Sequence, residues 1–145
     1  MSDVSDIIET FDLLGDWDQR YQYLVELGER LPAMPDAAKT DDNRVKPCMS
    51  KVWVQSHWDR DTPSLIRYHG DCDTSIIKGV LALLIDLCSG KSNAQIQALD
   101  FDALFHRLQL DEHLSPNRHV GIYAIVARMK SQAARLAEQG ARLAS

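Results

Sequence analysis

One cysteine in this chain lies among residues that favour sulfur chemistry. Arg44 and Lys46 precede Cys48, Lys51 follows it, and no acidic residue occurs from position 43 to position 54. Positive charge nearby favours the thiolate over the thiol, and the thiolate is the nucleophile when sulfur atoms exchange. The stretch is also typical of a loop, where reactive groups held by a rigid scaffold tend to lie. We therefore take Cys48 as the first candidate for a reactive residue.

The same residues also allow ordinary structural interpretations. A cysteine of unknown context is often a small buried hydrophobe, and Lys46 and Lys51 could be solvated charges that activate nothing. Cys72 lies in a turn-like stretch, where it could relay sulfur, form a disulfide with Cys48, or simply be tolerated as a small residue. Cys88 falls on an apolar helical stripe. We expect Cys88 to be an inert core residue.

Alternation of side-chain character predicts a hairpin directly after Cys48. Apolar and polar residues alternate with a period of two over residues 51–58, as in a strand with two different faces. Turn-forming residues follow at 59–63, and a second strand pattern covers 65–69. Residues 43–46 are long enough to add a short third strand at an edge.

Helical patterns surround this hairpin. Residues 3–14 form one amphipathic pattern, and Asp16 is a suitable N-cap for a second helix that ends at about residue 29 or 30. A third helix, capped by Asp73, Thr74 or Ser75, is apolar on nearly every side up to residue 88, which predicts a buried central helix. Further helices are expected from residue 92, over 101–108, and from 116 to about 137 or beyond. These patterns predict one α+β domain over residues 1–145, with a small antiparallel sheet of about three strands and helices mainly on one face.

Composition narrows the class of partner. The chain has 145 residues, 26% of them charged, and a net charge of −5, which argues against general binding to nucleic acid or to an anionic membrane. No stretch of 18 apolar residues and no secretory leader pattern occurs. Three cysteines at irregular spacing form neither a disulfide framework nor a CxxC motif. We therefore expect a cytoplasmic protein with reduced thiols, whose partner is a protein or a small molecule.

Several motifs in register resemble the SufE/CsdE family of sulfur-acceptor proteins. The similarity runs from about Trp17 to about Met129. It includes Leu-Gly-Glu-Arg-Leu-Pro at 27–32, Val-Lys-Pro-Cys-Met-Ser-Lys-Val-Trp at 45–53, Gly-Asp-Cys-Asp at 70–73, Ile-Lys-Gly at 77–79 and Leu-Ser-Pro-Asn-Arg at 114–118. Pro47 stands where the family usually has glycine, and Cys72 stands where it usually has serine or glycine.

The resemblance implies a function. It identifies Cys48 as the residue that accepts a persulfide sulfur from a PLP-dependent cysteine desulfurase, stimulates that enzyme, and passes the sulfur towards an iron–sulfur scaffold or another recipient. PLP would belong to the partner, so the chain needs no cofactor and acts as a carrier rather than as a stand-alone enzyme. Lys51, Asp71, Asp73 and Arg118 are the residues expected to meet the desulfurase. The resemblance does not separate the SufE branch from the CsdE branch, nor does it give the oligomeric state.

Two other functions stay open on the sequence. Cys48, Cys72 and Cys88 could assemble iron and sulfur if the fold gathers them, although separations of 24 and 16 positions make this unusual. The chain could also be a regulatory domain that binds a desulfurase without carrying sulfur. The five histidines show no recognised metal-ligand spacing, and no phosphate loop or hydrolase motif occurs.

Overall fold

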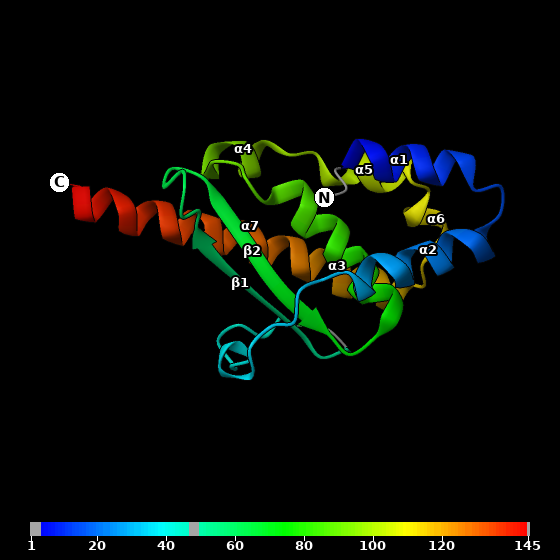
Figure 1. The fold of residues 1–145 in the computed structure, drawn as a ribbon, viewed down its shortest axis with the longest axis horizontal. Coiled ribbons are helices and arrows are strands. Elements are labelled where there is room, and N and C mark those ends of the chain that lie inside the picture. Colours follow the sequence, from blue (N-terminus) through cyan, green and yellow to red (C-terminus); the bar gives the residue numbers. More distant parts are fainter. Residues whose placement is uncertain (1–3, 47–49, 145) are drawn as a thin grey trace.

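The structure, a computed structural model, describes residues 4–46 and 50–144 (Figure 1). Within these residues the chain forms one hairpin, seven α-helices and one short 3-10 helix. In chain order they are α1 Val4–Leu13, α2 Trp17–Glu29, η1 Asp36–Ala38, β1 Val52–Trp58, β2 Ile66–Cys72, α3 Ser75–Cys88, α4 Asn93–Ala98, α5 Phe101–Arg107, α6 Leu110–His113 and α7 Pro116–Ala144. The predicted α+β class is confirmed.

The hairpin presents one face to the helices. β1 and β2 pair antiparallel from Val52 opposite Cys72 to Trp58 opposite Ile66. Val52, Val54, Ile66 and Tyr68 on this face are buried, because α3 covers β2 and α7 covers β1, whereas Ser56 and Trp58 at the far end of β1 are only half-buried. Figure 1 shows both helices behind the hairpin, with the C-terminal end of α7 extending beyond it. The opposite face carries mainly polar residues, as the alternating pattern predicts.

Helix α3 is the centre of the molecule, as its sequence predicts. It contacts α1, α2, α7 and β2, and most of its residues are buried. Two glycines permit these contacts. A Cβ atom on Gly79 would lie 2.1 Å from the carbonyl oxygen of Leu24 in α2, and one on Gly70 would lie 2.6 Å from the carbonyl oxygen of Trp53. Only a residue without a side chain fits at either position.

The structure corrects the expected third strand. Residues 43–46 form a single bridge between Arg44 and Trp53, so the sheet has two strands in the described part of the chain. Two hydrogen bonds hold this bridge, from Val45 N to the Val52 oxygen at 2.8 Å and from Val54 N to the Asn43 oxygen at 2.9 Å. A turn over residues 40–44 precedes the bridge and leaves too few extended residues for a strand.

Two further boundaries differ from the prediction. β2 continues to Cys72 rather than ending at residue 69, because Gly70 lets the strand lie against β1 and α3 instead of forming a turn. Helix α6 has no counterpart among the predicted elements. It follows Gln109, whose φ of 59° lies in the left-handed region, and this conformation separates it from α5.

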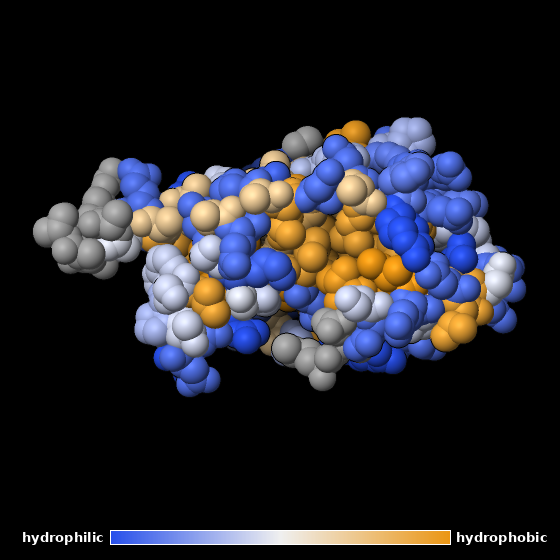
Figure 2. Space-filling view, turned by 90° about the horizontal axis from the view of Figure 1, so that it is seen from above, coloured by the Kyte–Doolittle hydropathy of each residue, from blue (hydrophilic) through white to orange (hydrophobic). Residues whose placement is uncertain are grey.

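The surface has an uneven distribution of hydropathy. Figure 2 shows apolar side chains gathered in a hollow at the centre of one face, with hydrophilic side chains on its flanks. No described helix is both long enough and apolar enough to cross a membrane.

Candidate functional site

The candidate site is the end of the hairpin at which β1 begins, β2 ends and α3 starts. We call residues 45, 50–52 and 71–75 the hairpin end. Lys51 N donates to the Asp73 carboxylate at 2.9 Å, and Asp73 N donates to the Lys51 oxygen at 3.1 Å. The hydroxyls of Ser50 and Thr74 lie 2.6 Å apart and share a hydrogen bond. These contacts tie the start of β1 to the junction between β2 and α3.

Cys48 is flanked on both sides by fixed residues. Pro47, Cys48 and Met49 themselves lie outside the residues that the structure describes. Before them, Val45 is 1% exposed and bonded to Val52; after them, Ser50 is bonded to Thr74. The chain on either side of the candidate thiol is therefore attached to the hairpin end.

Asp71 is the centre of an ion-pair cluster rather than an open contact residue. Its carboxylate lies 3.0 Å from Lys39 Nζ and 3.1 Å from Lys78 Nζ, and it accepts a hydrogen bond from Cys72 N at 2.8 Å. Partial burial acts to raise the pKa of Asp71, but the hydrogen bonds from Lys39, Cys72 and Lys78 outweigh burial and lower it. The hydrogen bond between Lys39 and Asp71 in turn raises the pKa of Lys39. The cluster joins β2 to α3 and to the segment after η1.

Lys39 is a member of this cluster that sequence reasoning missed. It lies at the C-terminal end of the 3-10 helix η1, more than thirty positions before Asp71, and its Nζ also lies 5.6 Å from the centre of the Trp53 ring. No local pattern relates these positions. The sequence does place a cation, Lys39, before an aromatic residue on the outer face of a predicted strand, Trp53. This is a weak signal for a contact between them, because many lysines precede aromatic residues at such distances.

The remaining expected contact residues have different surroundings. Asp73 is exposed, but its carboxylate is used by Lys51 N and Thr74 Oγ1. Lys51 is exposed, and its ammonium group forms no ion pair with any described residue. Lys46 pairs with Asp41 at 3.0 Å. The charge around the hairpin end is therefore more balanced than the sequence near Cys48 suggests.

Arg118 is not a member of the Asp71 cluster. It is half-buried in the first turn of α7, and its backbone N–H donates to Ser115 Oγ at 3.4 Å. The partners of Asp71 are Lys39 and Lys78, and Arg118 is not among them. No described contact joins Arg118 to the hairpin end.

Cys72 and Cys88 lie at opposite ends of α3. Cys72 is buried at the end of β2, and its sulfur accepts a hydrogen bond from Thr74 N at 3.4 Å. Cys88, the last residue of α3, is fully buried, and burial raises its pKa to about 12. Fourteen residues of helix separate the two by roughly 20 Å at about 1.5 Å per residue. The expectation that Cys88 is a core residue is confirmed, and the two sulfurs are too far apart to bind one cluster.

The histidines show one contact and no metal constellation. The rings of His57 and His69 meet on the outer face of the hairpin with centroids 5.3 Å apart, as diagonal rather than directly opposite neighbours. His69 Nε2 also lies 2.6 Å from Gln55 Oε1. Burial is the main cause that lowers the pKa of both histidines. Across the described residues no group of three or more His, Cys, Asp or Glu side chains is arranged to hold a metal ion.

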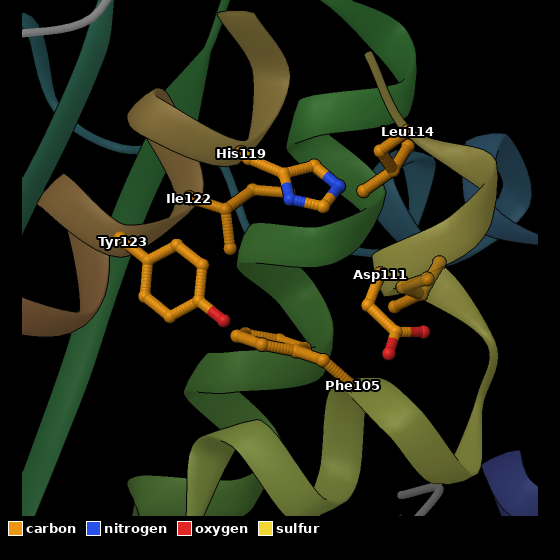
Figure 3. Close-up of a pocket in the computed structure, with 7 residues that line it drawn as sticks. Phe105, Asp111, Leu114, His119, Ile122 and Tyr123 are labelled. Atoms are coloured by element: carbon orange, nitrogen blue, oxygen red, sulfur yellow. The ribbon is translucent and has the colours of Figure 1, made fainter. Parts of the chain in front are cut away.

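A small cavity lies away from the hairpin end, between α5, α6 and α7. Figure 3 shows His119 beside Leu114 and Ile122, with Tyr123 and Phe105 on the other side. His119 Nε2 is buried and has no partner among the described residues. The cavity measures about 10 Å³, the size of a single water molecule, so it is too small for a substrate.

Comparison with known proteins identifies the family. Residues 5–133 match the profile of the SufE domain, described as an Fe-S metabolism associated domain. This chain belongs to the SufE family. SufE-like proteins described as uncharacterized, from Rhizobium meliloti and Rhizobium etli, are 36% and 35% identical over 134 residues, which span 92% of this chain and 96% and 90% of theirs. The family assignment associates this SufE-family chain with iron–sulfur metabolism.

A solved structure shares the fold. The solution structure of a hypothetical protein from Thermus thermophilus superposes with a TM-score of 0.74, covering 93% of this chain and 96% of that one at 20% identity. At this identity the likeness shows the SufE-like fold alone.

Proposed function

We propose that this SufE-family protein accepts sulfur on Cys48 from the persulfide of a cysteine desulfurase. The Cys48 thiolate attacks the outer sulfur of the donor persulfide, a new S–S bond forms on Cys48, and the donor cysteine leaves as a thiolate. The carrier then passes the sulfur to an iron–sulfur scaffold or another recipient. Removal of the persulfide from the donor stimulates the desulfurase.

The family match is the observation that carries this proposal. It covers residues 5–133, so the stretch around Cys48 lies well inside it. The residues on either side of the segment also support Cys48 as the acceptor, because Val45 and Ser50 are both attached where β1, β2 and α3 meet. A thiol whose loop is anchored on a rigid frame can be presented to a partner without disturbing the fold.

The start of α3, at the hairpin end, lacks a side-chain cap. Thr74 occupies the N-cap position of α3, but its side chain accepts no capping hydrogen bond from the first turn. The N-terminal amides of a helix carry partial positive charge, which favours an anion within about one turn. In the proposal, this charge and the ammonium group of Lys51, which pairs with no described acid, act together to favour a thiolate on the acceptor cysteine.

The partner and the place of reaction are parts of the proposal. PLP would be bound by the desulfurase and not by this chain. Exchange would take place in the cytoplasm, where thiols stay reduced. Lys51 and Arg118 remain the better candidates for contact with the desulfurase, whereas Asp71 and Asp73 already have partners in the fold and would act mainly by holding the surface in shape.

A mass measurement tests the proposal directly. The protein is incubated with a cysteine desulfurase and cysteine, and intact and peptide masses are recorded without reductant. We expect a gain of one sulfur atom on the peptide that contains Cys48, and no gain in Cys48→Ser, which also loses stimulation of the enzyme. Because Cys88 is fully buried with a raised pKa, Cys88→Ala should keep both the adduct and the stimulation.

The same experiment separates the alternatives. Stimulation that survives Cys48→Ser would refute sulfur transfer and favour a regulatory domain. An adduct on Cys72 that disappears in Cys48→Ser would show a relay from Cys48 to Cys72, whereas one that persists there would show that Cys72 accepts sulfur directly. Iron and sulfide that copurify with the protein and disappear in Cys72→Ala would favour a cluster scaffold.

A further inference from the structure

The two edges of the hairpin are closed to different extents. On the outer edge of β2, Ile66 N donates to the Lys91 oxygen at 2.8 Å, Gly90 N donates to the Ile66 oxygen at 2.8 Å, and Tyr68 N donates to Ser89 Oγ at 3.2 Å. On the outer edge of β1, the bridge at residues 43–45 covers only Val52 and Val54. The second half of β1 has no neighbouring strand within the described chain.

Ser56, in this second half of β1, has an open backbone. Val54 directs its N–H and its oxygen away from β2, towards Asn43 and Gln132. Backbone groups of an antiparallel strand alternate in direction, so Ser56 directs its N–H and oxygen to the same side. No described residue bonds to either group. An open strand edge of this kind is a template for another chain, and proteins usually cover it.

A groove runs along this edge between β1 and α7. It has a volume of about 170 Å³, which is room for several water molecules. Asn43 and Ser56 line one side, and Arg128, Gln132 and Arg135 line the other. We call these five residues the β1-edge groove.

Gln132 shows that this groove is built to bond a backbone. It is 9% exposed, and its Nε2 donates to the Val54 oxygen at 2.8 Å, in the position that a neighbouring strand would take. Its Oε1 is buried and bonded to no described residue, and Arg128 Nε, one helical turn earlier on α7, is in the same state. One acceptor and one donor next to each other match the N–H and C=O of a peptide unit.

We propose that the β1-edge groove binds an extended segment of a partner protein that carries acidic side chains, and that this segment adds a strand to the open half of β1. Backbone hydrogen bonds to Ser56, Gln132 and Arg128 provide affinity, as in other strand-addition complexes. The two arginines of the groove outnumber the one acid that also lines the space, Asp42, so the groove favours acidic side chains over basic ones. This binding is independent of sulfur transfer on Cys48.

Nuclear magnetic resonance of the full chain with short peptides tests this inference. One peptide alternates valine with glutamate and a second alternates valine with lysine. A third has the sequence of the glutamate peptide, but every second backbone amide is N-methylated. We expect the glutamate peptide to shift the Ser56 amide resonance and slow its hydrogen exchange. The lysine peptide should bind about tenfold more weakly, and the methylated peptide should leave Ser56 exchange unchanged because it lacks the donors.

Charge-reversed variants locate the effect. Arg135→Glu should weaken the glutamate peptide about threefold or more and improve the lysine peptide. Arg30→Glu, which makes the same change of net charge at the exposed end of α2, should alter neither affinity. Both variants are checked for unchanged thermal unfolding.

Several outcomes overturn the inference. They are the absence of binding at Ser56, equal affinity for the glutamate and lysine peptides, and full binding by the methylated peptide. Protection of Ser56 that rises with protein concentration in the absence of peptide would show that a second copy of the chain covers this edge instead.

Discussion

Two neighbouring residues of helix α3, Lys78 and Gly79, hold it in place through contacts of different kinds. Gly79 meets α2 backbone to backbone, with the contact buried and apolar. One residue earlier, Lys78 belongs to the polar set at the hairpin end through its ion pair with Asp71. The first contact depends on shape and the second on charges and hydrogen bonds that are partly exposed to water.

This difference teaches how the site can combine rigidity with local opening. A close-packed backbone contact has no alternative geometry and is lost only when the helices separate. A hydrogen bond or ion pair at a half-exposed position contributes only about 1 kcal/mol, so it can open while the rest of the fold persists. We infer that the α2–α3 contact sets the frame and that the polar contacts govern the segment around Cys48.

Gly79→Ala should have the largest effect, because it breaks the frame. The added Cβ would lie 2.1 Å from the Leu24 oxygen. That oxygen belongs to the backbone of α2, which cannot shift as easily as the end of a flexible side chain. We expect the free energy of unfolding to fall by about 3 kcal/mol, at the upper end for overpacked cores. Urea unfolding measures it. Gly15→Ala is the matched control, since a Cβ there meets nothing within 4 Å and stability should change by less than about 0.5 kcal/mol.

Asp71→Asn should have an intermediate and pH-dependent effect. Its pKa is lowered in the folded state, so the stability that it contributes is present above its unfolded pKa of about 3.9 and is lost as pH falls through the folded value. We expect the variant to be less stable by about 1 kcal/mol at neutral pH, from two partly exposed ion pairs. The difference should shrink as pH falls below about 4, where the carboxylate of the unfolded chain takes up a proton, and should vanish once the folded carboxylate is protonated as well.

A matched control separates this cluster from surface charge in general. Asp36 also approaches Lys39, at 3.7 Å, but its side chain is fully exposed. Asp36→Asn should leave the unfolding curves unchanged at both pH values. A difference between Asp71→Asn and wild type that persists at low pH would mean that asparagine disturbs the packing rather than the ion pairs.

Much of the frame could be predicted from the sequence, because local patterns determine it. The apolar stripe of α3, the Asp16 cap of α2 and the alternation along β1 each reflect a rule that acts over a few residues. The end of β2 could not be predicted in this way. Gly70 looks like a turn residue, and its role as the point of close approach to Trp53 appears only when the strands are paired.

The polar contacts of the candidate site were much less predictable. The sequence points to Asp71 as part of a docking surface but not to its ion pair with Lys39. That pair joins segments far apart in the chain, so no local pattern predicts it. The bond between Ser50 and Thr74 likewise spans 24 positions. Such pairs depend on how the hairpin and α3 are placed together, and no periodicity in the sequence reports that placement.

Ser50→Ala should have the smallest effect on global stability and the clearest effect on local opening. It removes the hydrogen bond to Thr74 Oγ1 at a half-buried position, and Thr74 keeps its contact with Asp73, so the free energy of unfolding should fall by only about 0.5–1 kcal/mol. Local openings of the flank should become about threefold more frequent, which follows from the same range of energies. Hydrogen exchange at the Ser50 and Lys51 amides and the alkylation rate of Cys48 measure it. Ser75→Ala, at an exposed position of α3 beside the same junction, should change neither rate. If Ser50→Ala instead lowered global stability as much as Gly79→Ala while exchange at Ser50 and Lys51 stayed the same, the polar contacts would belong to the frame and the distinction between the two contacts of α3 would be wrong.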